Sequence, residues 1–288
     1  MTHPDIYKSA EGARVLARQY TALLDRWPVP ARYLDIPTRQ GRTFVVASGP
    51  PDAPPLVLLH GSGANSAMWA EDVACWAPHF RILAVDVIGE PGLSASARPP
   101  LASDAHALWL DDVLDRLGVD RAAFVGTSLG GWLALDYAVR RPERVERLVL
   151  RCPSGIGRQK TAVLAASLLL LPLGRWGRRT MLKLALGPLP PTTAREHAFG
   201  EAVLLIHRHF RPRRERIPVI DDAALAALPM PVHATLGARD RLLDSQHTAR
   251  RLQRLAPHAT VCLLPGQGHL LRGLAEPTLE ALLAEAAR

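Results

Sequence analysis

Cysteine is scarce in this sequence, which excludes a disulfide framework and a cysteine-based zinc site. The 288 residues include three cysteines, Cys75, Cys152 and Cys262, which lie far apart along the chain. Disulfide scaffolds need several paired cysteines, and zinc sites need cysteine and histidine at short spacings. We therefore expect each cysteine to pack as a small apolar residue, and we expect no metal ion and no other cofactor.

Lysine is almost absent, although the chain is basic. The formal net charge is +8, and only three of the 35 basic residues are lysines. The arginines are scattered, and the densest basic run, residues 207–216, contains a single aromatic residue, Phe210. Surfaces that bind nucleic acids gather basic residues on one face and interleave aromatic platforms. We interpret the run as a solvated helix end and expect no nucleic-acid partner.

Long apolar runs are also missing. The longest, residues 161–173, is shorter than the roughly 20 residues that span a bilayer. We expect it to be buried or to line a groove, without stable insertion into a membrane. The first residues lack the apolar core of a signal peptide. The sequence therefore favours a cytoplasmic protein, either a monomer or a homodimer.

What the chain does contain is an alternation of short strand patterns with longer helical patterns. Seven β-rich runs recur between apolar periodic segments. They cover residues 42–47, 55–60, 80–86, 122–126, 145–151, 231–237 and 259–265. Strands that alternate with helices need crossover connections, which predict a mostly parallel sheet with helices on both faces.

One long segment interrupts this alternation. Between residues 154 and 228 the sequence shows helical patterns separated by proline and glycine, and no convincing strand. We expect a helical cap inserted at 154–228 into an α/β core formed by 32–153 and 229–288, preceded by a helical extension at 1–31. Such a cap would cover the C-terminal edge of the sheet, where open α/β sheets bind ligands.

A candidate nucleophile lies at one strand-to-helix junction. The sequence "GTSLG" places Ser128 between the strand 122–126 and a helix that begins at Leu129. A turn of this kind exposes the serine hydroxyl and admits only small neighbours, here Gly126 and Gly130. It also leaves the N–H of Leu129 unpaired at the start of the helix, available to an oxyanion. The alternative is that serine and glycine merely cap the helix.

A serine nucleophile needs a base and an acid, and the sequence supplies both in order. His269 lies in the glycine-rich loop after the last strand, and Asp240 lies in the loop after the strand 231–237. The histidine would take the serine's proton, and the acid would orient the histidine. Asp244 is the competing acid, but it stands where a helix cap is expected, so we favour Asp240.

Two further loops carry candidates with supporting roles. In "HGSG" the chain turns at His60 and Gly61 after a strand, which would present the N–H of Ser62 as a second oxyanion donor. For His60 we favour a bracing role in the turn. Asp86, at the end of another strand, is expected to brace neighbouring loops. Glu90 is either the acid of a proton relay or an exposed loop charge, and we favour the exposed charge.

These motifs together resemble the α/β-hydrolase superfamily over residues 32–288. The motifs, in order, are "HGSG", "DVIGEPGLS", "GTSLGG", "LGARDRL" and "GQGH". The resemblance is greatest to cap-bearing bacterial carboxylesterases. It implies an eight-stranded, mostly parallel sheet with an inserted helical cap. It also implies Ser128 as nucleophile, Asp240 as acid, His269 as base, and the N–H groups of Ser62 and Leu129 as the oxyanion hole.

The function expected on this basis is hydrolysis of a small, largely apolar carboxylic ester through an acyl-enzyme, without a metal ion. The same triad also serves thioesterases, lactonases, perhydrolases, C–C bond hydrolases and acyltransferases, so these alternatives stay open. Haloalkane dehalogenases and epoxide hydrolases use aspartate as nucleophile, and serine at position 128 disfavours both. A non-catalytic small-molecule receptor on this fold is disfavoured because all three triad candidates are present.

Overall fold

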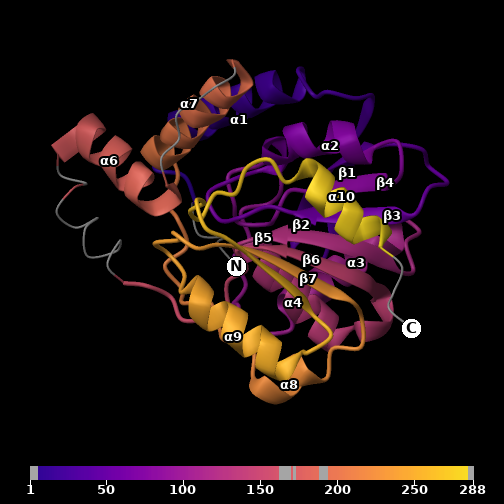
Figure 1. Cartoon of the computed structure of the whole chain (residues 1–288). Coiled ribbons are helices and arrows are strands. Elements are labelled where there is room, and N and C mark those ends of the chain that lie inside the picture. Colours follow the sequence, from indigo (N-terminus) through magenta and orange to yellow (C-terminus); the bar gives the residue numbers. More distant parts are fainter. Residues whose placement is uncertain (1–5, 162–169, 171–172, 188–193, 285–288) are drawn as a thin grey trace.

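The computed structural model describes residues 6–161, 170, 173–187 and 194–284, and one eight-stranded sheet runs through its centre (Figure 1). The strands lie in the order β1-β2-β4-β3-β5-β6-β7-β8. They span Ala31–Thr38 (β1), Gly41–Ser48 (β2), Pro55–Leu59 (β3), Arg81–Val85 (β4), Ala122–Thr127 (β5), Val145–Arg151 (β6), Val232–Gly237 (β7) and Thr260–Leu264 (β8). The pairs β1–β2 and β2–β4 are antiparallel and all others are parallel, which confirms the predicted fold class.

All seven predicted strands are present, and the structure adds β1. This strand forms a hairpin with β2, in which Thr38 pairs with Gly41. It lies at the edge of the sheet, and Ile36 is its single buried residue. Because pairing with β2 rather than burial of one face defines the strand, its sequence lacks the apolar pattern that predicts the other strands.

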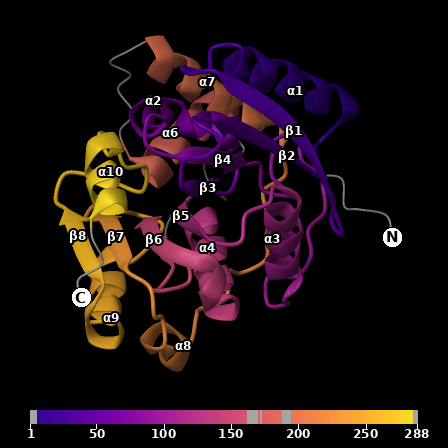
Figure 2. The ribbon, with the colours of Figure 1, turned by 90° about the vertical axis from the view of Figure 1, so that its right-hand side faces the viewer.

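Helices cover both faces of the sheet, as predicted. On one face lie α3 (Ala105–Arg116), α4 (Leu129–Arg140), α8 (Asp222–Ala226) and α9 (Ser245–Leu255). On the other lie α1 (Ala10–Leu24), α2 (Ala70–Trp76) and α10 (Ala275–Leu283), with the 3-10 turn η1 (Ser66–Trp69) leading into α2. A second 3-10 turn, η2 (Pro142–Arg144), leads from α4 into β6. Figure 2 shows α3 beside α4 on the first face.

Two further helices, α6 (Gly174–Leu186) and α7 (Ala194–His209), lie within the expected cap. In Figure 1 α7 lies alongside α1. A small core joins them, made by Ile6, Leu16, Ile206 and Phe210. The N-terminal helix is therefore packed against α7 as well as against the sheet, where Tyr20 and Leu24 enter the core.

The last part of the expected cap segment packs differently. Ile220, Leu225 and Leu228 belong to the main core under α4 and α9. The expected division of the chain into extension, core and cap, with boundaries at residues 31, 153 and 228, stays a prediction. Most of the apolar run 161–173 lies outside the described residues. No helix in the described ranges has both the length and the apolar character needed to cross a membrane.

A buried ion pair joins β6 to α2 and α10 on one face of the sheet. The Arg151 guanidinium donates to both carboxylate oxygens of Asp72, at 2.9 Å each, and also to the Leu274 carbonyl and the Thr278 hydroxyl. Its charge lies over the rings of Trp69 and Trp76, at 5.6 and 5.1 Å from their centroids. These contacts hold together segments that lie far apart in the sequence.

Removing one partner of this pair should strongly destabilise the protein. In Asp72→Ala the Arg151 charge stays buried without its carboxylate, a change that costs about 3–5 kcal/mol in proteins. The matched control is Asp35→Ala, because Asp35 pairs with Arg42 while both side chains are more than half exposed. We expect the control to change the free energy of unfolding by less than about 1 kcal/mol. Urea denaturation followed by circular dichroism measures both, and equal stabilities would contradict the prediction.

Candidate active site

The candidate nucleophile lies in a strained turn between β5 and α4. Ser128 has a φ angle of 53°, a left-handed conformation that among the described non-glycine residues occurs elsewhere only at Cys152. Glycine on either side lets strand, turn and helix pack closely. A Cβ on Gly126 would lie 2.4 Å from the carbonyl oxygen of Gly130, and one on Gly130 would lie 2.0 Å from that of Leu59. The turn therefore fixes the serine at the C-terminal edge of the sheet.

The structure brings together the three residues predicted to form the triad. The Nε2 atom of His269 lies 3.0 Å from the Ser128 hydroxyl oxygen, and its Nδ1 atom lies 2.7 Å from Oδ2 of Asp240. These pairs are 141 and 29 positions apart in the sequence. His269 is 7% exposed and Asp240 is 1% exposed. This arrangement can carry a proton from the hydroxyl to the imidazole.

The carboxylate of Asp240 is held in place by backbone donors. Its Oδ1 atom accepts the N–H groups of Leu242 and Leu243, at 2.7 and 3.0 Å. Burial alone would raise the pKa of Asp240, but its hydrogen bonds with His269 and these two N–H groups outweigh burial and lower the pKa. The competing acid, Asp244, instead accepts the N–H of His247 and caps α9.

One candidate oxyanion donor, Leu129, follows the serine in the chain, and the other, Ser62, belongs to a turn that packs against it. Gly61 lies so close to Ser128 that a Cβ on it would be 3.5 Å from that of the serine. The next residue, Ser62, and Leu129 at the first position of α4 each have a backbone N–H without an acceptor in the described part of the chain. Two such donors beside a nucleophile can stabilise a developing negative charge.

His60 and Asp86 contact several loops around this turn. The buried His60 ring bonds the Gly61 carbonyl through Nδ1 and accepts the Val87 N–H through Nε2, both at 2.9 Å. Burial lowers its pKa, which favours the neutral ring. Asp86 accepts hydrogen bonds from the Tyr20 hydroxyl, from the N–H and hydroxyl of Ser66, and from the N–H of Leu93. Both residues therefore connect loops that meet at the sheet edge.

Glu90 is buried, although we expected it to be an exposed charge in a loop. It is 0% exposed, and its Oε2 atom accepts the Gly63 N–H at 2.7 Å and the Ser62 hydroxyl at 3.3 Å. Burial raises its pKa to about 7. The interpretation as an exposed charge is therefore wrong. No local signal marks this residue as buried, because its partners lie 27 and 28 positions away in the sequence.

Cys152 lies beside the candidate acid. Its sulfur accepts the Gly237 N–H. The sulfur, a carboxylate oxygen of Asp240 and a ring nitrogen of His269, each able to bind a metal ion, all lie within 4.8 Å of one another. Burial raises the pKa of this thiol, which disfavours the thiolate that binds metal ions. The direct bond between His269 and Asp240 also occupies the atoms that an ion would need. This group is better suited to hold the carboxylate than to hold a metal.

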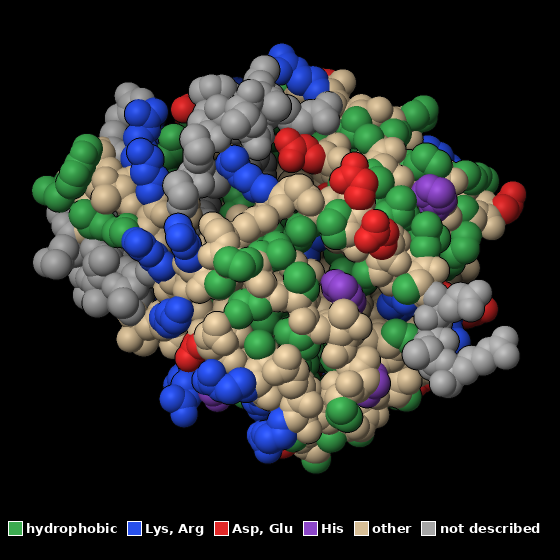
Figure 3. Space-filling model, viewed as in Figure 1, with side chains coloured by type: hydrophobic (Ala, Val, Ile, Leu, Met, Phe, Trp, Pro, Cys, Tyr) green, Lys and Arg blue, Asp and Glu red, His purple; other side chains and the backbone are tan. Residues whose placement is uncertain are grey.

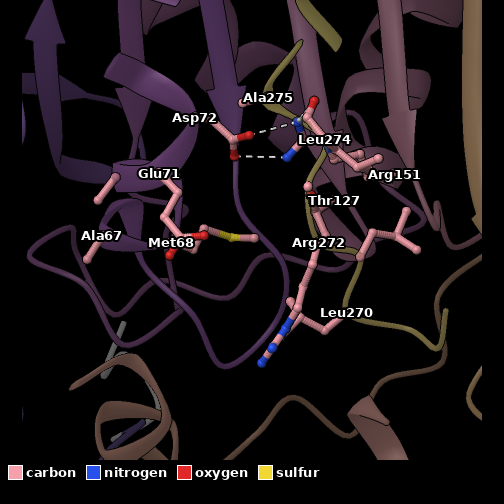
Figure 4. A pocket seen from close by; sticks show the side chains of 13 residues that line it. Ala67, Met68, Glu71, Asp72, Thr127, Arg151, Leu270, Arg272, Leu274 and Ala275 are labelled. Atoms are coloured by element: carbon pink, nitrogen blue, oxygen red, sulfur yellow. Dashed lines mark hydrogen bonds and ion pairs between the residues drawn. The ribbon is translucent and has the colours of Figure 1, made fainter. Parts of the chain in front are cut away.

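A cavity of about 150 Å³ is lined by the residue before the candidate nucleophile and by the residue after the candidate base (Figure 4). It lies between the start of α2 and the loop 270–275, with Thr127 directly before the nucleophile and Leu270 directly after the histidine. Met68 and several leucine and alanine side chains line it together with four charged side chains, those of Glu71, Asp72, Arg151 and Arg272. In Figure 3 acidic side chains gather over α2 and α10 on this face, and basic ones over α6 and α9. The cavity therefore offers both apolar and charged contacts to a small ligand.

Known proteins share both this fold and the length of the chain. The family model for the alpha/beta hydrolase fold matches residues 54–219. Carboxylesterase YbfK of Bacillus subtilis is 31% identical over 271 residues, covering 92% of this chain and 90% of that protein. Its crystal structure, described as carboxylesterase CesB, superposes with a TM-score of 0.82 at 29% identity, over 95% of this chain and 99% of that one.

A second solved relative is similarly close. The naproxen esterase of Bacillus subtilis, also called carboxylesterase NP, has a TM-score of 0.82 at 27% identity, over 96% of this chain and 97% of that one. Together with the family match, these similarities show that the chain belongs to the α/β-hydrolase family. Within the family, YbfK and the naproxen esterase are both named as carboxylesterases.

Substitution at Gly130 tests the packing on which the turn depends. In Gly130→Ala the new Cβ would meet the backbone of β3, which cannot move without disturbing the sheet, so we expect a loss of at least about 3 kcal/mol in the free energy of unfolding. The control, Gly200→Ala in α7, meets no atom within 4 Å. There alanine should leave stability unchanged or raise it by up to about 1 kcal/mol. Urea denaturation compares the variants, and a fully stable Gly130→Ala protein would refute the expected clash.

Proposed function

We propose that this protein is a serine carboxylesterase that hydrolyses a small, largely apolar ester through an acyl-enzyme. One observation carries the proposal: the unbroken chain of hydrogen bonds from the Ser128 hydroxyl through His269 to Asp240, next to two N–H groups that have no acceptor among the described residues. The similarity to proteins named as carboxylesterases over more than nine-tenths of the chain supports the same substrate class.

In the first half of the reaction, the neutral His269 takes the proton of the Ser128 hydroxyl as the oxygen attacks the ester carbonyl carbon. The ionised Asp240 stabilises the imidazolium that forms. The carbonyl oxygen gains negative charge and accepts hydrogen bonds from the N–H groups of Ser62 and Leu129. The imidazolium then gives its proton to the leaving alcohol oxygen, the C–O bond breaks, and the acyl group stays on the serine.

In the second half, a water molecule takes the place of the alcohol. His269 removes one proton from the water while its oxygen attacks the acyl carbon, and the same two N–H groups hold the second oxyanion. Collapse of this intermediate returns the proton to Ser128 and releases the carboxylic acid. The buried positions of His269 and Asp240 favour this cycle, because charges interact more strongly away from bulk water.

The leucine, alanine and methionine side chains in the cavity next to Thr127 and Leu270 support a substrate with a small hydrophobic group. The cap also reaches the triad: Gly187, at the end of α6, lies 3.6 Å from the Cα atom of Gly268 when measured from an added Cβ. Residues of the cap therefore border the loop that carries the base. Thioesters, lactones and acyl transfer to an alcohol require the same three residues, and comparative assays distinguish them.

Replacing the serine tests the proposal directly. We expect Ser128→Ala to lower kcat/KM for p-nitrophenyl acetate by at least about 10³-fold, because the oxyanion donors alone give only residual catalysis. The matched control is Ser103→Ala, where the serine hydroxyl donates only to the Pro100 carbonyl at a loop. Thermal unfolding monitors the fold of both variants. Full esterase activity in a folded Ser128→Ala protein would end the proposal.

A panel of acyl donors tests the substrate class. We expect p-nitrophenyl esters with short acyl chains to give higher kcat/KM values than matched thioesters and lactones. Product analysis in the presence of a competing alcohol measures the share of acyl transfer. Mass-spectrometric detection of acyl-Ser128 after rapid acid quench would show the covalent intermediate. A lactone or thioester preferred by more than about tenfold would assign the enzyme to one of those classes instead.

A further inference from the structure

The carboxylate of Glu90 lies beneath the turn that carries one oxyanion donor. Its Oε2 atom accepts two hydrogen bonds from this turn, one from the N–H of Gly63 and one from the hydroxyl of Ser62. Its Oε1 atom is buried and has no hydrogen-bond partner in the described part of the chain. A carboxylate is rarely buried so completely without a structural or functional reason.

The charges of two arginines outside the proposed triad, Arg98 and Arg213, act on this carboxylate. Arg98 follows Glu90 in the same loop and donates to the carbonyls of Gly89 and Arg211, at 2.9 and 2.7 Å. Its guanidinium also lies 5.2 Å from the centre of the Phe210 ring. Arg213 comes from the segment that leaves the cap after α7, and it donates to Pro99 and Glu215. Both arginine charges favour the ionised form of Glu90.

The position of Arg213 corrects one expectation from the sequence. The run 207–216 is expected to be a solvated helix end, and Arg208, Arg211, Arg214 and Arg216 are indeed exposed. The side chain of Arg213, however, is only 7% exposed. It lies beyond the end of α7 and turns inward, where its charge acts on Glu90.

We propose that Glu90 is a positioning residue that holds the Gly61–Gly63 turn in the geometry of an oxyanion hole. The proposal rests on the proposed function, since it concerns the same oxyanion hole. Glu90 touches neither Ser128 nor His269 in the hydrogen bonds of the site. It acts through the backbone of the turn.

The geometry of the turn explains why a single carboxylate, that of Glu90, is enough to fix it. Gly63 has a φ angle of +68°, so the chain reverses sharply at this residue. The Gly63 N–H is directed to Glu90, whereas the preceding N–H, that of Ser62, has no acceptor within the described ranges and belongs to the turn whose Gly61 packs against Ser128. A hydrogen bond to an ionised acceptor is roughly twice as strong as one between neutral groups. The charge on Glu90 therefore restricts the movement of the turn.

The same contacts make the turn sensitive to pH. Burial raises the pKa of Glu90 to about 7, against the opposing effects of the Gly63 N–H, Arg98, Arg213 and the Ser62 hydroxyl. As the pH falls through this value the carboxyl takes up a proton, its bonds to the turn weaken, and the hole loses rigidity. Two other groups face Arg213. Glu215 is paired with it, and His106 on α3 has a pKa lowered to about 3 and so stays neutral over this range.

The first test separates the oxyanion hole from ground-state binding. We expect Glu90→Gln to lower kcat for p-nitrophenyl acetate about tenfold at pH 8. It should weaken inhibition by an alkyl trifluoromethyl ketone, whose adduct with Ser128 carries an oxyanion, by a similar factor, while KM changes less than about threefold. The control Asp112→Asn removes a partly exposed carboxylate that pairs with Arg39, and it should leave all three values unchanged.

A folded Glu90→Gln protein with kcat and inhibitor affinity within about twofold of the unsubstituted enzyme would overturn the proposal. So would a lower kcat with unchanged inhibitor affinity, because the defect would then lie outside the hole. Loss of activity in Ser128→Ala is measured alongside. If that variant keeps its activity, the serine mechanism itself is wrong. This outcome differs from a Glu90→Gln protein whose kcat and inhibitor affinity are unchanged.

The second test keeps Glu90 and changes its neighbour, so it does not depend on the folding of Glu90→Gln alone. Removing the positive charge in Arg213→Gln should raise the pKa of Glu90 and move the acid limb of the kcat profile to higher pH by about 0.5–1 unit. The exposed neighbour Arg214 supplies the control, Arg214→Gln. In the Glu90→Gln background the Arg213 substitution should cause no further shift. A profile that does not move, or an equal shift in both backgrounds, would contradict the proposal.

Discussion

The site depends on the close approach of backbone to backbone where β3, β5 and α4 meet. Gly130 packs against the carbonyls of Leu59 and His60 with no space for a side chain, and Gly126 packs against Gly130 in the same way. This contact brings the end of β3 beside the turn after β5, so the strained serine and the turn at Gly61 become neighbours. The positions of the proposed nucleophile and of the two candidate N–H donors therefore follow from one packing constraint.

The remaining members of the site are brought to this point by loops with buried polar anchors. Asp240 is held by the two N–H groups that follow it, and Cys152 fills the space beside it with a thiol that burial keeps neutral. The chain beyond His269 is tied down where Arg151 meets the Leu274 carbonyl. Each anchor satisfies polar groups that would otherwise be buried without partners, so the same bonds position the proposed triad and stabilise the fold.

Much of this could be predicted from sequence, because the relevant signals are local. Apolar runs and glycine-rich turns marked seven strands and the loops that carry Ser128, Asp240 and His269. The errors have a common cause, since β1, Glu90 and Arg213 are defined by contacts with distant segments. β1 is an edge strand created by its pairing with β2, and Glu90 is buried by a turn 27 positions earlier. The residues next to Glu90, a glycine and a proline, give no sign that its carboxylate is buried.

The contact between α1 and α7 makes α7 less independent of the N-terminal helix than its place in the chain implies. Half of the small core that supports α7 is supplied by Ile6 and Leu16, and the same N-terminal helix reaches Asp86 through the Tyr20 hydroxyl. Two stretches at opposite ends of the first 210 residues therefore form one structural unit. Side chains on the buried face of α7 must fit against α1. A segment containing α7 that is transplanted from a relative would therefore need the matching N-terminal helix in order to pack.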